Sequence, residues 1–382
     1  MAPKLFEPLQ IRGLTLKNRI VVAPMMQHAA QNGLANHWHL VHLGKFALGG
    51  AGLILTESTA VAANARGGQN DLGLWADEQV PALRSVVDFV HDSGSLMGVQ
   101  LGHAGRKAGT RPLWEGGTPL SVEEMQAIDP NWVRMGPSDL MPAPGWSHPQ
   151  VMSIQDIDRV VEEFVLATIR AERAGFDVVE LHYGHGYLVA SFLSRVSNLR
   201  EDEYGAGLEG RMHLALRIAR EVRREWPQHK PLFCRLSCVD GALGGWGMDD
   251  TVVLAKALKD VGVDVIDCSS GGLTEQGAAL PVARGLGFQV PFAHRVRTEA
   301  QVMTQAVGMI VDARQAEAIV RDGQADLIAI AREALKDPYW PLHAQAELAP
   351  DPSYQDWPVR HGIWLAKRHP ALMAALNSAT SR

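Results

Sequence analysis

The chain has 382 residues, of which 46% are hydrophobic and 20% charged, a composition typical of globular proteins with a large buried core. Its formal net charge of −6 provides no basic surface for nucleic acid, so we expect small-molecule partners. No apolar run reaches the ~20 residues of a bilayer span, and no hydrophobic signal region is evident, so we expect a cytoplasmic protein without membrane contact. Three cysteines, Cys234, Cys238 and Cys268, lie inside apolar runs and are predicted to be buried thiols.

The first elements along the chain predict a capped barrel. Residues 1–18 are expected to form a β-hairpin, with its turn at RGLT, that covers the bottom of the domain. Short apolar or β-branched runs then recur and predict about eight strands, the number that closes a barrel. These runs cover residues 19–25, 52–59, 96–103, 176–183, 231–238, 264–271, 306–311 and 326–332.

Helical periodicity fills the intervals between these strands. Residues 153–175 carry an apolar stripe that begins at Ser153 and ends at Gly175. Residues 249–262 repeat this pattern, with aspartates expected as caps at the start and Gly262 at the end. Alternating strands and helices indicate a parallel α/β protein. About eight such units favour a (β/α)8 TIM barrel, although an open doubly wound sheet has the same local pattern.

Two segments interrupt the alternation. Residues 105–152 contain much of the proline and glycine and several tryptophans, and they predict a long, lid-like loop after the third strand at the active-site face. Residues 341–382 form a C-terminal extension, with a surface helix expected around 361–376. We expect a single domain over residues 1–382.

The strand ends predict the class of chemistry, because barrel enzymes carry their catalytic groups there. These ends contain histidines, tyrosines, a glutamine and an arginine, with Glu57 as the one nearby carboxylate of the first three strands. A metal site is disfavoured because His182 and His185 lack acidic co-ligands. Hydrogen-bond donors without a nucleophile suit oxyanion stabilisation while a cofactor performs the difficult step. Glycine turns near residues 269–272 and 307–309, together with Arg332, favour a cofactor that carries a phosphate.

Several strings, in this order, carry a family resemblance: LFEPLQIRGLTLKNRIVVAPM at the N-terminus, GVQLGHAGRKA at 98–108, LHYGHGYLVASFLSRVSNLREDEYG at 181–205, DVIDCSSGGL at 264–273 and AREALKDPYW at 331–340. The chain resembles the Old Yellow Enzyme family of FMN-dependent ene-reductases, in particular its short, thermophilic-like bacterial branch. The resemblance covers nearly the whole chain.

The resemblance implies an FMN site, NADPH or NADH as reductant and no metal. In that site, Gln100 contacts the flavin ring, Arg235 places a positive charge beside it, and Arg332 holds the phosphate. The full set of implied cofactor-binding residues is Ala23, Pro24, Met25, Met26, Ser58, Gln100, Arg235, Gly308, Ala331 and Arg332.

The resemblance also implies the catalytic groups. His182 and His185 hydrogen-bond a substrate carbonyl, and Tyr187 protonates the α-carbon after hydride transfer from flavin N5 to the activated C=C bond of an unsaturated carbonyl or nitro compound.

This chain departs from the branch in its implied substrate pocket. Met26 replaces the usual cysteine or threonine, His28 replaces tyrosine, and Tyr183 stands where small or apolar residues are common. These departures leave a dehydrogenation or an oxygen-using reaction open as an alternative on the same fold and flavin, and a metal-dependent barrel lyase as a less favoured one. The branch also suggests a homodimer or homotetramer in which a C-terminal residue, here Trp357 or Arg360, reaches the neighbouring pocket.

Overall fold

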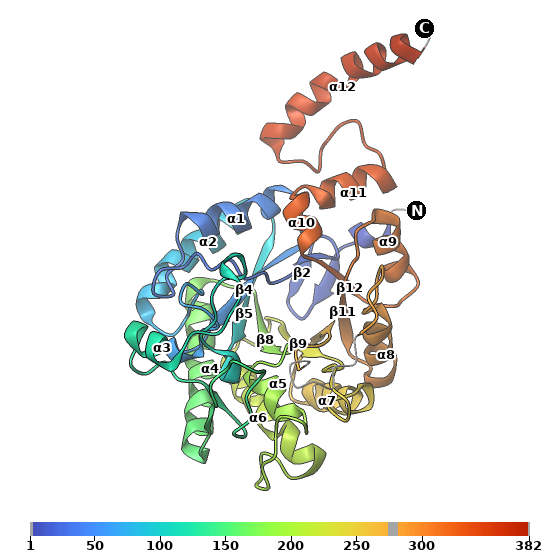
Figure 1. Ribbon diagram of the computed structural model, residues 1–382. Helices are drawn as coiled ribbons and strands as arrows, with labels where there is room; N and C mark the ends of the chain where they lie inside the picture. Colours follow the sequence, from blue (N-terminus) through green and yellow to red (C-terminus); the bar gives the residue numbers. More distant parts are fainter. Residues whose placement is uncertain (1–2, 274–281, 381–382) are drawn as a thin grey trace.

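The computed structural model describes residues 3–273 and 282–380, so residues 1, 2, 381 and 382 of the predicted cap and extension lie outside the described part. Eight parallel strands close into a barrel surrounded by helices, which confirms the predicted (β/α)8 fold (Figure 1). The ring closes because the last strand pairs with the first. In order around the ring, the strands are β3 (Ile20–Val22), β4 (Leu53–Ala60), β5 (Leu96–Gly102), β8 (Val178–Tyr183), β9 (Leu232–Ser237), β10 (Val265–Ser269), β11 (Met303–Val307) and β12 (Leu327–Ile330).

The N-terminal hairpin covers the bottom of this barrel, as predicted. Strands β1 (Leu9–Ile11) and β2 (Leu14–Leu16) pair antiparallel. Ile11 and Leu16 are buried in one cluster with inward side chains of the barrel strands, such as Val178 and Phe233. The hairpin therefore supplies the apolar floor, and this closure leaves the opposite end of the barrel for the site.

Each barrel strand alternates between two environments. In β8, Val179 and Leu181 pack among helix residues, whereas Val178 joins the floor. The same period of two directs Glu180 and His182 into the barrel. The seventh strand, β11, begins at Met303, whereas the sequence predicted its start at residue 306. The apolar pattern missed the first residues of this strand because Thr304 and Gln305 are polar, although both are buried.

Helices occupy the outer layer. Helix α4 (Ile154–Ala174) begins after Ser153 and ends at Gly175, as predicted. Helix α7 (Met248–Asp260) has Gly247 as its N-cap, which corrects the predicted aspartate cap; Asp250 instead accepts a hydrogen bond from the Gly247 amide. The other helices are α1 (His37–Leu48), α2 (Val80–Asp92), α3 (Val122–Ile128), α5 (Leu188–Leu193), α6 (Gly207–Glu225), α8 (Val290–Ala300), α9 (Ala313–Arg321), α10 (Arg332–Lys336), α11 (Trp340–Leu348) and α12 (Val359–Thr380).

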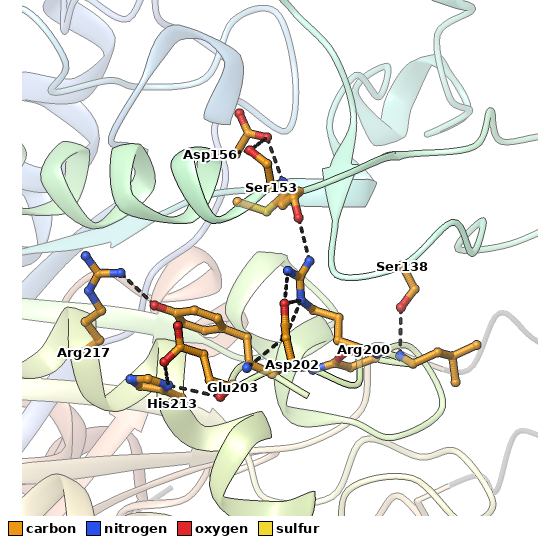
Figure 2. A network of polar contacts seen from close by, with 12 residues as sticks. Ser138, Ser153, Asp156, Arg200, Asp202, Glu203, His213 and Arg217 are labelled. Carbon is orange, nitrogen blue, oxygen red and sulfur yellow. Dashed lines mark hydrogen bonds and ion pairs between the residues drawn. The ribbon is translucent and has the colours of Figure 1, made fainter. Parts of the chain in front are cut away.

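The long segment after β5 is more structured than a bare loop. It contains α3 and the two short strands β6 (Met135–Gly136) and β7 (Gln150–Val151), which pair with each other. Arg200, in the loop after α5, donates 2.6 Å to the Met152 carbonyl, and the Leu199 amide donates to Ser138 Oγ (Figure 2). These contacts attach the insertion to the loops at the mouth of the barrel.

The C-terminal helix α12 extends away from the barrel (Figure 1). It covers the predicted helical region and is longer than expected at both ends. Several of its apolar side chains, including Trp364, are exposed. Among the described residues, no helix is long and apolar enough to cross a membrane.

Candidate functional site

The turn that follows β8 brings His182 and His185 together. Their ring centroids lie 5.1 Å apart, and Nδ1 of His185 lies 3.4 Å from Nε2 of His182. His185 and Gly186 both have positive φ angles, of 59° and 73°. A Cβ on Gly186 would lie 2.1 Å from the Gly272 carbonyl oxygen, so the turn requires glycine at this position.

Hydrogen bonds define the tautomers of both imidazoles. The Gly184 amide donates to Nδ1 of His182, which leaves the proton of the neutral ring on Nε2, facing His185. Nε2 of His185 then donates 2.8 Å to Ser269 Oγ. Burial, followed by the nearby positive charges, lowers the pKa of His182 well below its usual range and that of His185 to about 3. Both rings are therefore neutral donors at neutral pH.

Tyr187 lies beside this pair at the start of α5. Its ring centroid is 5.1 Å from that of His182, in an edge-to-face arrangement. Together with Met26 and Ser58, it lines a small cavity at the barrel mouth. The three catalytic residues predicted from the sequence therefore meet at one place.

His28 lies near the same cavity, in contact with one of its walls. Its Nδ1 is 2.8 Å from Oδ1 of Asp71, which lines the cavity. The Trp114 ring of the insertion packs edge-to-face on the imidazole, with centroids 5.7 Å apart. The hydrogen bond that His28 donates to the Asp71 carboxylate is the largest cause that raises the pKa of His28. Unlike a tyrosine at this position, His28 is able to carry a positive charge beside the Asp71 carboxylate.

A polar layer lies inside the barrel, above the apolar floor. Gln100 donates 2.8 Å from Nε2 to the Glu180 carboxylate, and Arg235 Nε lies 3.4 Å from Oδ2 of Asp267. Both carboxylates are fully buried. The sequence interpretation, which found no carboxylate pair at the strand ends, missed them because they lie one alternation below the ends. The sequence did contain a signal for them, because each of two apolar runs includes one charged residue, Glu180 or Asp267.

The predicted phosphate side is formed by the last two strands. Gly308 follows β11 with a φ of 112°, and a Cβ there would lie 2.7 Å from Nε2 of Gln289. Ala331 ends β12 with unusual backbone angles, and Arg332 is exposed at the start of α10. The Ala23 amide donates to the Ile330 carbonyl, which joins the first strand end to this side. Pro24 and Met25 continue along the mouth, half-buried.

Two predicted substrate residues lie elsewhere. Tyr183 is fully buried, packs among helix residues and donates its hydroxyl hydrogen to the Ala215 carbonyl of α6. The alternation of β8 explains this correction, because His182 points inward and its neighbour must point outward. Trp357 stacks on Tyr339, with centroids 5.5 Å apart, next to α11. Within this chain, Trp357 therefore packs against the C-terminal segment.

Three further residues support this turn: the sequence interpretation missed Lys107 and Ser237, and it assigned the segment with Ser269 to the cofactor phosphate instead. Lys107 Nζ donates to the carbonyls of His185 and Gly272, at 3.1 and 2.6 Å. Ser237 Oγ accepts from the His185 amide, and Ser269 Oγ accepts from its imidazole. They hold the turn that presents the two histidines. A lysine from the third loop and serines from neighbouring strands meet only in the closed barrel, so local patterns contain no signal of this contact.

Comparison with known proteins identifies the family. Residues 4–351 match the NADH:flavin oxidoreductase / NADH oxidase family. The chain belongs to this family. The match confirms the resemblance to the Old Yellow Enzymes and makes the protein an oxidoreductase with FMN as cofactor and a nicotinamide nucleotide as reductant.

Individual relatives in the flavin oxidoreductase family agree in length and fold. An NADPH dehydrogenase of Geobacillus sp. (strain WCH70) is 41% identical over 350 residues, which cover 91% of this chain and 95% of that protein. The NADPH dehydrogenase of Bacillus subtilis (strain 168) is 39% identical over 350 residues, which cover 91% of this chain and 96% of that protein. The structure of morphinone reductase in complex with tetrahydroNAD has a TM-score of 0.75 at 26% identity, covering 93% of this chain and 97% of that one.

The residues at the barrel mouth fit FMN. Arg235 Nε and Oε2 of Glu180 are buried polar atoms without hydrogen-bond partners in the described structure, as are both side-chain polar atoms of Gln305. A polar ring placed on this layer would supply hydrogen-bond partners to these buried atoms. The exposed guanidinium of Arg332 and the glycine backbone at Gly308 provide the chemistry that a phosphate needs. Among the described residues, no cluster of three or more potential metal ligands is found.

Proposed function

We propose that this flavin oxidoreductase reduces the activated C=C bond of α,β-unsaturated carbonyl or nitro compounds. The observation that carries the proposal is that the rings of His182, His185 and Tyr187 lie together at the end of β8, with both imidazoles neutral. The bound FMN supplies a hydride to the β-carbon of the alkene. The protein residues then act on two substrate atoms: the oxygen, where negative charge develops, and the α-carbon, which accepts a proton.

The two histidines act on the substrate oxygen. Negative charge develops there as the β-carbon accepts hydride, so donors aimed at this oxygen stabilise the transition state more than the ground state. To donate to the substrate, Nε2 of His182 must turn from His185, and Nε2 of His185 must leave Ser269. Ser269 therefore serves as the resting partner of the His185 proton.

Tyr187 supplies the proton to the α-carbon. A phenol hydroxyl can act as a general acid toward carbon. The Tyr187 ring packs against the His182 ring, so the proposed acid lies next to a proposed oxyanion donor.

We propose that FMN contacts the residues implied by the resemblance. Its ring would be held by Ala23, Pro24, Met25 and Met26 together with Ser58, Gln100 and Arg235. Its phosphate would be held by Gly308, Ala331 and Arg332. We also propose a homodimer or homotetramer, in which Trp357 would have to leave Tyr339 to reach a neighbouring pocket.

The test is anaerobic consumption of cyclohexenone or maleimide with NADPH by the FMN-loaded enzyme. We expect one reduced alkene for each NADPH oxidised. The alternative, a dehydrogenation or an oxygen-using reaction, predicts NADPH oxidation only with oxygen or no alkene reduction at all. In a second measurement, His182→Ala should weaken phenol binding to the oxidised enzyme at least tenfold, as expected for loss of a hydrogen bond of about 1.5 kcal/mol to a charged oxygen. Unchanged affinity would contradict the donor role.

A further inference from the structure

The polar layer inside the barrel contains more negative than positive groups. Glu180 from β8 and Asp267 from β10 face one guanidinium, that of Arg235 from β9. Glu180 and Asp267 are fully buried, and Arg235 is 8% exposed. With all three groups ionised, the layer would hold one unbalanced negative charge away from water, which is costly. One proton on either carboxylate removes that imbalance.

The contacts indicate which carboxylate holds this proton. Burial raises the pKa of Asp267 as well, but Asp267 is the direct ion-pair partner of Arg235, at 3.4 Å, and this contact favours its ionised form. Glu180 contacts the neutral amide of Gln100 instead, and its second oxygen has no hydrogen-bond partner in the described structure. Burial, and next the negative charge of Asp267, raise the pKa of Glu180 to about 8, while Arg235 and the Gln100 hydrogen bond act in the opposite direction. The neighbouring His182 stays neutral and adds no charge.

We propose that Glu180, in molecules where it is ionised before reduction, takes up a proton from solvent when the flavin accepts hydride, so that the buried layer compensates the negative charge gained by the cofactor. Hydride transfer from NADPH moves two electrons and one proton together, which gives NADP⁺ and a flavin with one additional negative charge. This transfer consumes no solvent proton. The compensating proton comes from solvent and forms the O–H bond of Glu180. Its positive charge offsets the additional negative charge of the flavin.

This role makes Glu180 a positioning residue as well. Its carboxylate accepts from Gln100 Nε2, which leaves the Gln100 carbonyl oxygen available to the flavin. Arg235 stands on β9, between the strands that carry the two carboxylates, and is one of the proposed ring contacts. The inference rests on the proposed placement of FMN, but it does not depend on which alkene is reduced.

The experiment measures solvent protons during anaerobic reduction by NADPH without alkene, with an indicator dye in weak buffer. At about one pH unit above the Glu180 pKa, we expect the FMN-loaded wild type to take up a large fraction of one proton per flavin. About two units below that pH, where Glu180 is already protonated, uptake should nearly vanish. Glu180→Gln should abolish the alkaline uptake. Glu163→Gln is the matched control, because burial also raises the pKa of that glutamate, to about 7, on the outer helix α4.

Equal uptake by the wild type and Glu180→Gln would overturn the proposal. Infrared difference spectra of the wild type provide a measurement that needs no variant: reduction at the alkaline pH should produce the C=O stretch of a protonated carboxyl group. Its absence would overturn the proposal even if Glu180→Gln fails to bind FMN. Neither the proton-uptake measurement nor the infrared measurement uses an alkene. Both can therefore be interpreted even if the ene-reduction test fails.

Discussion

The imidazole of His28 and the carboxylate of Asp71 form a nearly buried pair at the cavity, with 2.8 Å between Nδ1 and Oδ1. The Gly68 amide donates to the other carboxylate oxygen, at 2.7 Å, and so fixes the orientation of Asp71. The hydrogen bond and charge of Asp71, with the charges of Glu57 and Glu115, outweigh burial and raise the pKa of His28 above 6.5. His28 therefore keeps its proton to a higher pH than a free imidazole does.

The first prediction concerns this pair. Asp71→Asn should lower the pKa of His28, as measured by NMR titration of the imidazole. Since the folded protein raises this pKa, the stabilisation from protonated His28 is present below 6.5 and is lost as the pH rises through the raised value. Asp139→Asn, which removes the partner of exposed His148, is the control and should leave His28 unchanged. An identical His28 titration in Asp71→Asn would refute the assignment.

The second prediction tests the proton donor. Tyr187→Phe should slow alkene-dependent flavin reoxidation by about 10²–10⁴-fold, the usual contribution of a positioned general acid. Flavin reduction by NADPH should remain nearly unchanged, because it needs no proton from Tyr187. Stopped-flow absorbance of the two half-reactions checks this. Equal losses in both half-reactions would mean that the substitution perturbs the site as a whole.

The third prediction concerns the histidine turn. Gly186→Ala should destabilise the fold and displace His185, because the added Cβ would overlap the Gly272 carbonyl oxygen. Gly207→Ala is a matched control: its φ is also positive, at 71°, but the added Cβ meets nothing within 4 Å. The control should cost about 1–2 kcal/mol, the strain of a left-handed residue, and Gly186→Ala clearly more. Chemical denaturation checks both, and equal losses would show that the overlap is relieved.

The fourth prediction concerns the attachment of the insertion. Arg200→Ala removes the hydrogen bond to the Met152 carbonyl and the ion pair with Asp202 (Figure 2). We expect faster hydrogen exchange across residues 138–152. Arg217→Ala, which removes a hydrogen bond to Tyr204 in the same network, should leave the exchange of these residues unchanged. If both variants behave alike, Arg200 has no specific role in attaching the insertion.

The fifth prediction follows from the outward position of Tyr183. Tyr183→Phe leaves the buried Ala215 carbonyl without this donor and should cost about 1–3 kcal/mol of unfolding free energy. Phenol affinity should not change, because the side chain does not face the histidines. A weaker phenol complex with unchanged stability would instead support the substrate-binding role predicted from the sequence.

The sequence alone predicted the barrel, the helix from Ser153 to Gly175 and the place of His182, His185 and Tyr187 at the end of the fourth barrel strand. Hydrophobic period, caps and glycine positions are local properties, and the strand-end histidines lie within one short turn. Only the tertiary structure decided that Tyr183 faces α6, that Lys107 and Ser269 hold His185, and that Glu180 and Asp267 share one arginine. The physical reason is barrel closure: it brings alternate residues from distant strands into one buried layer, where contacts depend on register and charge balance rather than on neighbours in the chain.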